Sequence, residues 1–281
     1  MKRNRKLIFF ITIILSLMFA PQVINAEIPE LVANKTKTAP KIDGVFEQQE
    51  WNGTFFNIKN GAPNTNTTER FDENFTADVY TQWDDINLYI CAVVTKEEHI
   101  NDNNKEEMYM GDCMQVNIMP NWPELTTGEG WNELGFMASS DFSRQESYRW
   151  FELGTGVASA KPYDDADFAI KREGINTVYE IAIPWKSVTP EGMVYKSGDK
   201  IGYAVAFTIK DQIDKECLGI EYANSMFSKN PSLAATLLLN DDQNLTENNG
   251  ERSKIIIITI ASIIVIGSVA FFIFKKKFKN K

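Results

Sequence analysis

The sequence predicts an all-β ectodomain, an antiparallel β-sandwich of jelly-roll-like type, followed by one C-terminal transmembrane helix. Two observations predict the fold class: short segments alternate polar and apolar residues at the period of a strand, and Gly, Asn and Asp residues separate them. A third observation predicts the topology, because two charge-free apolar runs bracket the chain near its ends. The elements are taken below in chain order.

The N-terminal apolar run has the features of a secretory signal peptide. Four basic residues within the first six positions precede a charge-free stretch from Leu7 to Ala20, which is shorter than a bilayer is thick. A short polar stretch then ends at the small residue Ala26. We therefore expect residues 1–26 to be removed as a signal peptide.

The alternating segments lie between the two apolar runs and predict one domain over residues 27–240. The predicted strands are Asp78–Trp83, Leu88–Val94, Met114–Met119, Asp167–Lys171, Val178–Ile183, Ile201–Ile209 and Ala235–Leu239. Residues Glu27–Ala39 are interpreted as a polar lead-in, and no amphipathic helical window of comparable length is present. Many short strands of this kind are typical of a sandwich.

The C-terminal part predicts a membrane anchor. Residues 241–253 are polar and have no apolar period, as in a flexible stalk. Residues 254–274 contain a charge-free run that is about 30 Å long as a helix, which matches a hydrocarbon core. The tail, residues 275–281, contains five lysines, and basic residues stay on the cytoplasmic side. The domain is therefore predicted to be extracellular on a single-pass protein of the cell membrane.

The charge of the extracellular part limits its partners. All 38 acidic residues lie between Glu27 and Glu251, whereas 4 of the 29 basic residues precede this segment and 7 follow it, which leaves 18 and a net charge of −20. Such a surface repels nucleic acid, anionic lipid and acidic polysaccharide. Neutral glycans and calcium remain compatible with it.

The sequence offers little catalytic chemistry. The single histidine, His99, follows a predicted strand and is interpreted as an exposed loop residue, without a nucleophile motif beside it. Three scattered cysteines have no metal-ligand spacing; a bridge between Cys91 and Cys113 is one option and buried free thiols are the favoured one. The sequence thus favours a non-catalytic protein.

Aromatic residues are the stronger functional indication, because they form 12% of the chain and include 6 tryptophans. Flat rings stack on the apolar C–H faces of sugars. Trp51, Trp83 and Trp185 lie in or beside strand patterns and are expected in the core. Trp122, Trp131 and Trp150 lie in or beside loops or in an aromatic run and are candidates for an exposed platform.

Several segments, taken in order, resemble carbohydrate-binding module family 9. They are Pro40–Gly44 with Glu50–Trp51, Trp83–Tyr89, Gly111–Val116, Tyr179–Trp185 with Gly198–Gly202, and Asn230–Ser232 with Leu237–Leu239. The corresponding family patterns are "IDG…W", "WD-x-x-x-LY", "D-S-V-E", "YEIAIPW…GD-x-IG" and "DPS…L-x-L". Together these segments span almost the whole predicted domain.

The resemblance implies a sugar site between two aromatic walls. The matching positions hold Tyr109, just before the "D-S-V-E" strand, and Phe227, just before "DPS". Asn224 matches a polar sugar contact, and Gln115 stands where the family often has a glutamate, so it keeps a hydrogen bond but loses a charge. A family arginine falls near Gly135, which cannot replace it. Without this arginine, the resemblance does not extend to the family's specificity for the reducing ends of sugars.

The resemblance also implies a structural calcium ion, without identifying its ligands. The acidic excess and turn carboxylates such as Asp43, Asp84 and Asp85 are consistent with such a site.

The predicted function is non-catalytic recognition of a neutral oligo- or polysaccharide at the cell surface, in carbohydrate catabolism; action beside a separate glycoside hydrolase is left open. Two alternatives remain open. Similar sandwiches carry a b-type haem in electron transfer, for which His99 with Met108 or Met110 would be the ligands. The other alternative is a domain that has lost sugar binding and contacts a partner protein.

Overall fold

The computed structural model describes residues 28–51, 55–68, 74–122, 131–152, 158–210 and 217–241. The predicted signal peptide, the transmembrane helix, the cytoplasmic tail and nearly all of the stalk lie outside these residues. None of the helices within the described ranges is long and apolar enough to cross a membrane.

All seven predicted strands are present, most of them one or two residues longer than expected. They are β4 (Thr76–Trp83), β5 (Asn87–Thr95), β6 (Cys113–Met119), β10 (Asp167–Glu173), β11 (Asn176–Pro184), β12 (Lys200–Lys210) and β14 (Ala235–Asn240). Seven further strands are β1 (Glu30–Lys35), β2 (Phe55–Lys59), β3 (Thr65–Thr67), β7 (Asn132–Ala138), β8 (Gln145–Phe151), β9 (Ala158–Pro162) and β13 (Cys217–Tyr222). The short helices are η1 (Lys105–Met110), α2 (Trp185–Val188) and η3 (Pro231–Leu233).

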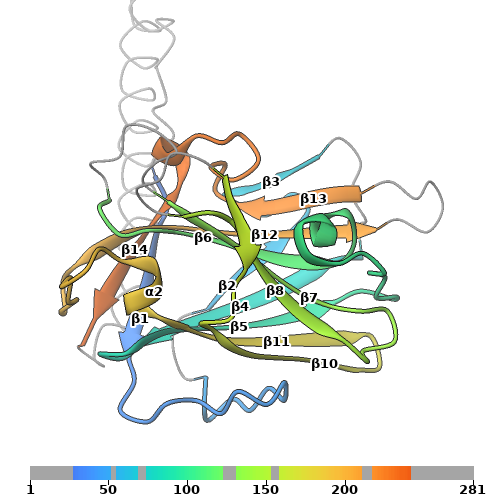
Figure 1. Ribbon diagram of the computed structural model, residues 1–281, viewed down its shortest axis with the longest axis horizontal. Coiled ribbons are helices and arrows are strands. Elements are labelled where there is room, and N and C mark those ends of the chain that lie inside the picture. The colour runs from blue at the N-terminus through green and yellow to red at the C-terminus, as the bar shows by residue number, and fades with distance from the viewer. Residues whose placement is uncertain are drawn as a thin grey trace, which may run out of the picture.

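The strands form one sheet that curls into two facing halves (Figure 1). Its order is β10-β11-β5-β4-β1-β14-β12-β6-β7-β8-β9, with β2 paired to β4 and β13 paired to β12 and β3. Rings from the two halves meet in the core: Phe75 lies 5.6 Å from Phe207, and Phe136 lies 5.4 Å from Phe168, between centroids. The architecture is therefore sandwich-like, as predicted.

Strand β1 corrects two sequence predictions. Residues Glu27–Ala39 are not only a polar lead-in, because Glu30–Lys35 forms a strand. This strand is also parallel to both neighbours, pairing Glu30 with Thr236 of β14 and Asn34 with Gln82 of β4, so the sheet is not purely antiparallel. Its side chains are mostly half-buried, and its pairing with β14 joins the two halves of the sheet (Figure 1).

The glycine-containing motif near residue 43 is structural. The buried carboxylate of Glu180, on β11, accepts the backbone N–H groups of Asp43 (2.9 Å) and Gly44 (2.7 Å) and the indole N–H of Trp51 (2.9 Å). Gly44 has a φ of +76°, and an added Cβ would lie 2.9 Å from Lys171 Cγ. The segment before β2 is thereby fixed across the outer face of β11.

The tryptophans and cysteines test the burial predictions. Trp51, Trp83 and Trp185 are buried as expected, but Trp131 is also buried, so the prediction of a partly exposed Trp131 is wrong. Trp131 packs with Met119 and Ala234 beneath Phe151, which removes it from solvent. Cys91 and Cys113 are buried free thiols, in agreement with the favoured option, and Cys217 is an exposed free thiol.

Candidate functional site

The candidate sugar site lies on the outer face of strands β13, β12, β6, β7 and β8. One row across these strands reads Glu221, Ala206, Gln115, Gly135 and Tyr148, each directly opposite the next. Directly paired residues of antiparallel strands point to the same face. Gln115 lies between the small residues Ala206 and Gly135 in this row, so its amide lies low on the face. We call this row the floor of the site; larger side chains from the loops surround it.

Helix η1 places Tyr109 at the edge of this floor. Met108 is buried and anchors the helix against Cys113, while the side chain of Asn101 donates to the Met108 carbonyl at 2.8 Å. The Tyr109 ring is 45% exposed, and its backbone carbonyl accepts the thiol of Cys217, on β13, at 2.8 Å. Tyr109 is thus an ordered but accessible aromatic ring.

The segment of residues 223–230 places Phe227 over β13, at the margin of the floor. The Glu221 carboxylate accepts the backbone N–H of Met226 at 2.9 Å, and the Met226 side chain packs on Ala204 and Ala206. Phe227 is 37% exposed and rests on Gly219, where an added Cβ would lie 2.6 Å from the ring. Phe227 is therefore a surface ring on the sheet and not a core residue.

The two predicted hydrogen-bonding residues differ in accessibility. Gln115 is 5% exposed and lies in the middle of the floor, between Ala206 and Gly135. Asn224 is exposed at the start of the 223–230 segment, three residues before Phe227. The structure thus places all four predicted residues on or around one face, with Gln115 at its base and Asn224 at its margin.

Two buried carboxylates beneath this site were not predicted from the sequence. Burial raises the pKa of Glu221 to about 7, against the opposing effect of its bonds to backbone N–H groups. Burial also raises the pKa of Glu133, whose carboxylate oxygens lie 2.7 and 2.8 Å from Lys229 Nζ. The Lys229 backbone has a φ of +51°. These carboxylates hold the Phe227 segment on the sheet.

Asn117 adds a second amide to the floor, two residues after Gln115 on β6. It is fully buried, and neither atom of its amide has a hydrogen-bond partner among the residues that the structure describes. It lies opposite Ala204 and Glu133, close to the segment that carries Phe227. A single polar residue in an alternating strand gives no sequence signal that distinguishes such a position.

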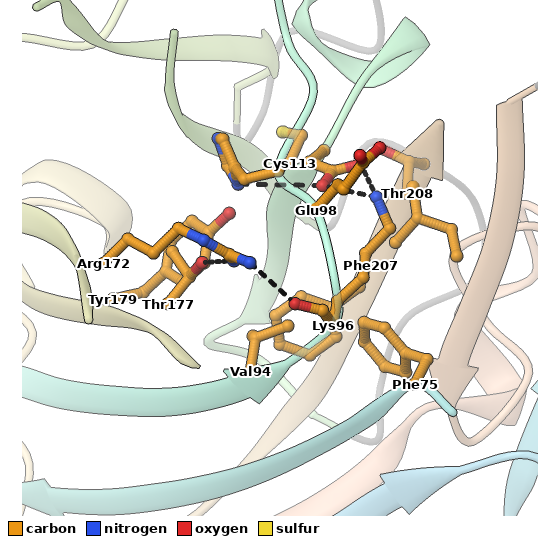
Figure 2. Close-up of a pocket in the computed structure, with 13 residues that line it drawn as sticks. Phe75, Val94, Lys96, Glu98, Cys113, Arg172, Thr177, Tyr179, Phe207 and Thr208 are labelled. Atoms are coloured by element: carbon orange, nitrogen blue, oxygen red, sulfur yellow. Dashed lines mark hydrogen bonds and ion pairs between the residues drawn. The ribbon is translucent and has the colours of Figure 1, made fainter. Parts of the chain in front are cut away.

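His99 is not an exposed loop residue, which corrects the sequence prediction. It is 9% exposed; its Nε2 lies 2.9 Å from the Ala138 carbonyl, and its Nδ1 lies 3.7 Å from Asp112. Lys96 Nζ also contacts Asp112 at 2.8 Å, and Arg172 donates to the Lys96 carbonyl (Figure 2). Burial lowers the pKa of His99. This cluster joins the β5 end to β6 and β10.

The cavity beside His99 is too small for a haem. Its volume is about 10 Å³, which is at most the space of one water molecule. Met108 points instead into the cluster of Cys113, Met137 and Tyr148, while Met110 is exposed at the end of η1. The described residues thus give the haem alternative no support.

The turn carboxylates named for calcium have other partners. Asp84 Oδ1 accepts the N–H groups of Ile86 and Asn87, Asp85 pairs with Lys35, and Asp43 lies 2.9 Å from Lys41 Nζ. Among the described residues, no group of three or more His, Cys, Asp or Glu side chains has the arrangement of a metal site. Calcium stays a prediction, tested by melting the protein with calcium and with chelator.

Comparisons with known proteins show the fold. No family profile and no curated protein sequence matches the chain. A carbohydrate-binding module family 9 from Caldicellulosiruptor kristjanssonii is similar in structure, in its complexes with glucose and with cellotriose. Both have a TM-score of 0.56 and 14% sequence identity; they cover 76% and 77% of this chain, and 97% and 96% of the module.

A Bacteroides uniformis protein proposed to bind carbohydrate is also similar, with a TM-score of 0.51 and 9% identity, covering 75% of this chain and 99% of its own. These likenesses extend over nearly the whole of each solved chain. The described domain therefore has the fold of the family 9 carbohydrate-binding modules.

Proposed function

We propose that the domain is a non-catalytic module that binds a neutral oligosaccharide. The observation that supports this most directly is the pair of exposed rings, Tyr109 and Phe227, on the face of the sheet that contains Gln115. An aromatic face buries apolar area without needing a charge. The C–H surfaces of a pyranose fit such rings, and side-chain amides select among its hydroxyl orientations.

The chemical class of the sugar follows from charge and from the similar structures. The net charge of −20 between Glu27 and Glu251 disfavours uronic acids and sulfated sugars. The structurally similar family 9 module was solved in complex with glucose and in complex with cellotriose. A neutral gluco-oligosaccharide is accordingly the ligand class proposed for this chain, with recognition and not bond cleavage as its role.

The place of this function is the outer surface of the cell membrane. This part of the proposal rests on the sequence, in which a signal-like segment precedes the domain and a span of about 20 apolar residues with a lysine tail follows it. Such a chain would hold the sugar site outside the cell, at the end of a polar stalk.

A glycan array tests the proposed function. The purified chain, labelled at an added terminal tag, is incubated with neutral, uronic and sulfated glycans. Binding is expected to neutral glycans that contain glucose units and is then quantified by isothermal titration calorimetry. If no neutral glycan gives a binding signal above background, the proposal is contradicted. Binding of a protein partner would then be the function to test.

A further inference from the structure

The indole of Trp150 covers Gly135, on β7, and fills the space that a side chain at position 135 would occupy. A Cβ added at Gly135 would lie 2.3 Å from Cη2 and 2.6 Å from Cζ3 of Trp150, and 2.9 Å from Sδ of Met108. Real Cβ atoms do not approach other heavy atoms this closely, so only glycine fits beneath the ring. The distal edge of Trp150 therefore lies on the floor of the site, directly beside Gln115.

Three neighbours fix the orientation of this indole. The Trp150 N–H donates to the Glu106 carbonyl of η1 at 3.0 Å. Its ring packs against Tyr109, with centroids 6.1 Å apart at 74°, and against Tyr148, with centroids 5.8 Å apart at 64°. Trp150 is nevertheless only half-buried, so an oriented aromatic surface stays accessible next to Tyr109.

The aromatic residues extend over more of the sheet than one sugar ring covers. Trp150 rests on β7 and Phe227 rests on β13, with β6 and β12 between them. Three strand spacings correspond to about 14 Å along the sheet, which is longer than a single pyranose. A ligand that contacts both ends therefore needs at least two linked sugar units.

We propose that Trp150 forms a second sugar subsite, which makes the domain selective for neutral oligosaccharides over monosaccharides. One unit binds near Tyr109 and Phe227, and the next presents its apolar C–H face to the Trp150 indole. A long charged side chain at position 135 would occupy the space beside Gln115, whereas with glycine there the Trp150 indole occupies it. The inference rests on the proposed function and specifies the size of its ligand.

The test compares glucose and cellotriose in isothermal titration calorimetry with the purified full-length chain in detergent. Trp150→Ala is expected to weaken cellotriose binding about tenfold, which corresponds to about 1.4 kcal/mol, and to change glucose binding by less than about twofold. Trp150→Phe keeps an apolar ring and is expected to lose less affinity than Trp150→Ala. Gly135→Ala displaces the indole while keeping it in the protein and also crowds Met108 beneath η1, so cellotriose binding should again weaken, with an effect on glucose binding as well.

Tryptophan fluorescence gives a second readout. Cellotriose should shift the emission maximum of the unaltered chain, and this shift should be absent in Trp150→Phe. The Trp150→Phe variant also provides the test if Trp150→Ala does not fold. Unchanged cellotriose affinity in Trp150→Ala or Gly135→Ala, with a normal melting temperature, would overturn the subsite and leave the proposed function intact. Failure of the unaltered chain to bind either sugar would overturn both.

Discussion

The carboxylate of Glu221 accepts the backbone N–H of Phe227, whose nitrogen lies 3.3 Å from each carboxylate oxygen. Glu221 is fully buried, and burial raises its pKa from 4.5 to about 7. A carboxylate buried between the sheet and the 223–230 segment thus helps to determine where one exposed ring of the candidate site lies. The position of Phe227 is thereby linked to a proton that titrates near neutral pH.

The pH dependence of stability should show the titration of Glu221. Between about pH 4.5 and 7 the unfolded chain has released this proton while the folded chain keeps it, so the free energy of unfolding falls as pH rises and becomes flat above about pH 7. Glu221→Gln should make this decline smaller, leaving the part that the raised pKa of Glu133 contributes, and should stabilise the protein at pH 8 by about 1–3 kcal/mol. Urea unfolding at several pH values measures it, with Glu173→Gln, at the exposed end of β10, as control.

Removal of either wall of the site should weaken sugar binding without unfolding the domain. Tyr109→Ala and Phe227→Ala each delete a ring that is more than a third exposed, so about 1–2 kcal/mol of binding free energy should be lost with a nearly unchanged melting temperature. Phe55→Ala removes a more exposed ring from β2, on the opposite half of the sheet, and should leave binding unchanged. Unchanged binding in both test variants would place the sugar elsewhere.

The Lys229–Glu133 ion pair should matter more at high pH. Lys229→Ala leaves the Glu133 carboxylate buried without its 2.7 Å partner, which should cost about 1–3 kcal/mol of stability at pH 8. Burial already raises the pKa of Glu133, and loss of the lysine raises it further, so the cost should shrink as the pH falls and the carboxyl takes up a proton. The double variant with Glu133→Gln should recover most of the loss at pH 8. An equal cost at pH 5 and pH 8 would rule out this linkage.

The proposed topology predicts the result of surface proteolysis. Protease added to intact cells should digest the domain, since the proposed topology places its exposed segments outside the cell, and should spare the proposed anchor and the lysine tail. An antibody against a C-terminal tag would then detect a small fragment. Full-length protein that resists protease until the cells are lysed would contradict the extracellular placement.

The strands predicted from the sequence are those whose alternation is strong on its own. Val79 and Asp78 of β4 face opposite sides, and the same holds along β11 and β12, so the period of two was visible. Strand β1 was missed because Glu30–Lys35 has little apolar alternation and is held by its pairing with β14, which begins some 200 residues later. Pairing between distant segments leaves no local signal.

The site was predictable to the extent that its residues follow one another along recognisable segments. Tyr109 and Phe227 were named as candidates through the resemblance, and the structure places both as exposed rings on the same face; their contact with a sugar stays a prediction. Trp150 was only one of several aromatic candidates, because its position depends on the absence of a side chain at Gly135. His99 was misjudged because the groups that bury it, Asp112 and Ala138, come together only in the folded chain.

The parallel pairing of β1 with β14 has a mechanical consequence. The chain enters this strand pair at Glu30 and leaves it at Asn240, at opposite ends, with β14 held on its other side by β12. Tension between a bound polysaccharide and a membrane attachment beyond Asn240 would pull β14 along its own axis. The hydrogen bonds on both sides of the strand would then be loaded together in shear, instead of breaking one after another as in an unzipping hairpin. A pull along the axis of β14 would therefore be resisted by the hydrogen bonds to β1 and to β12 at the same time.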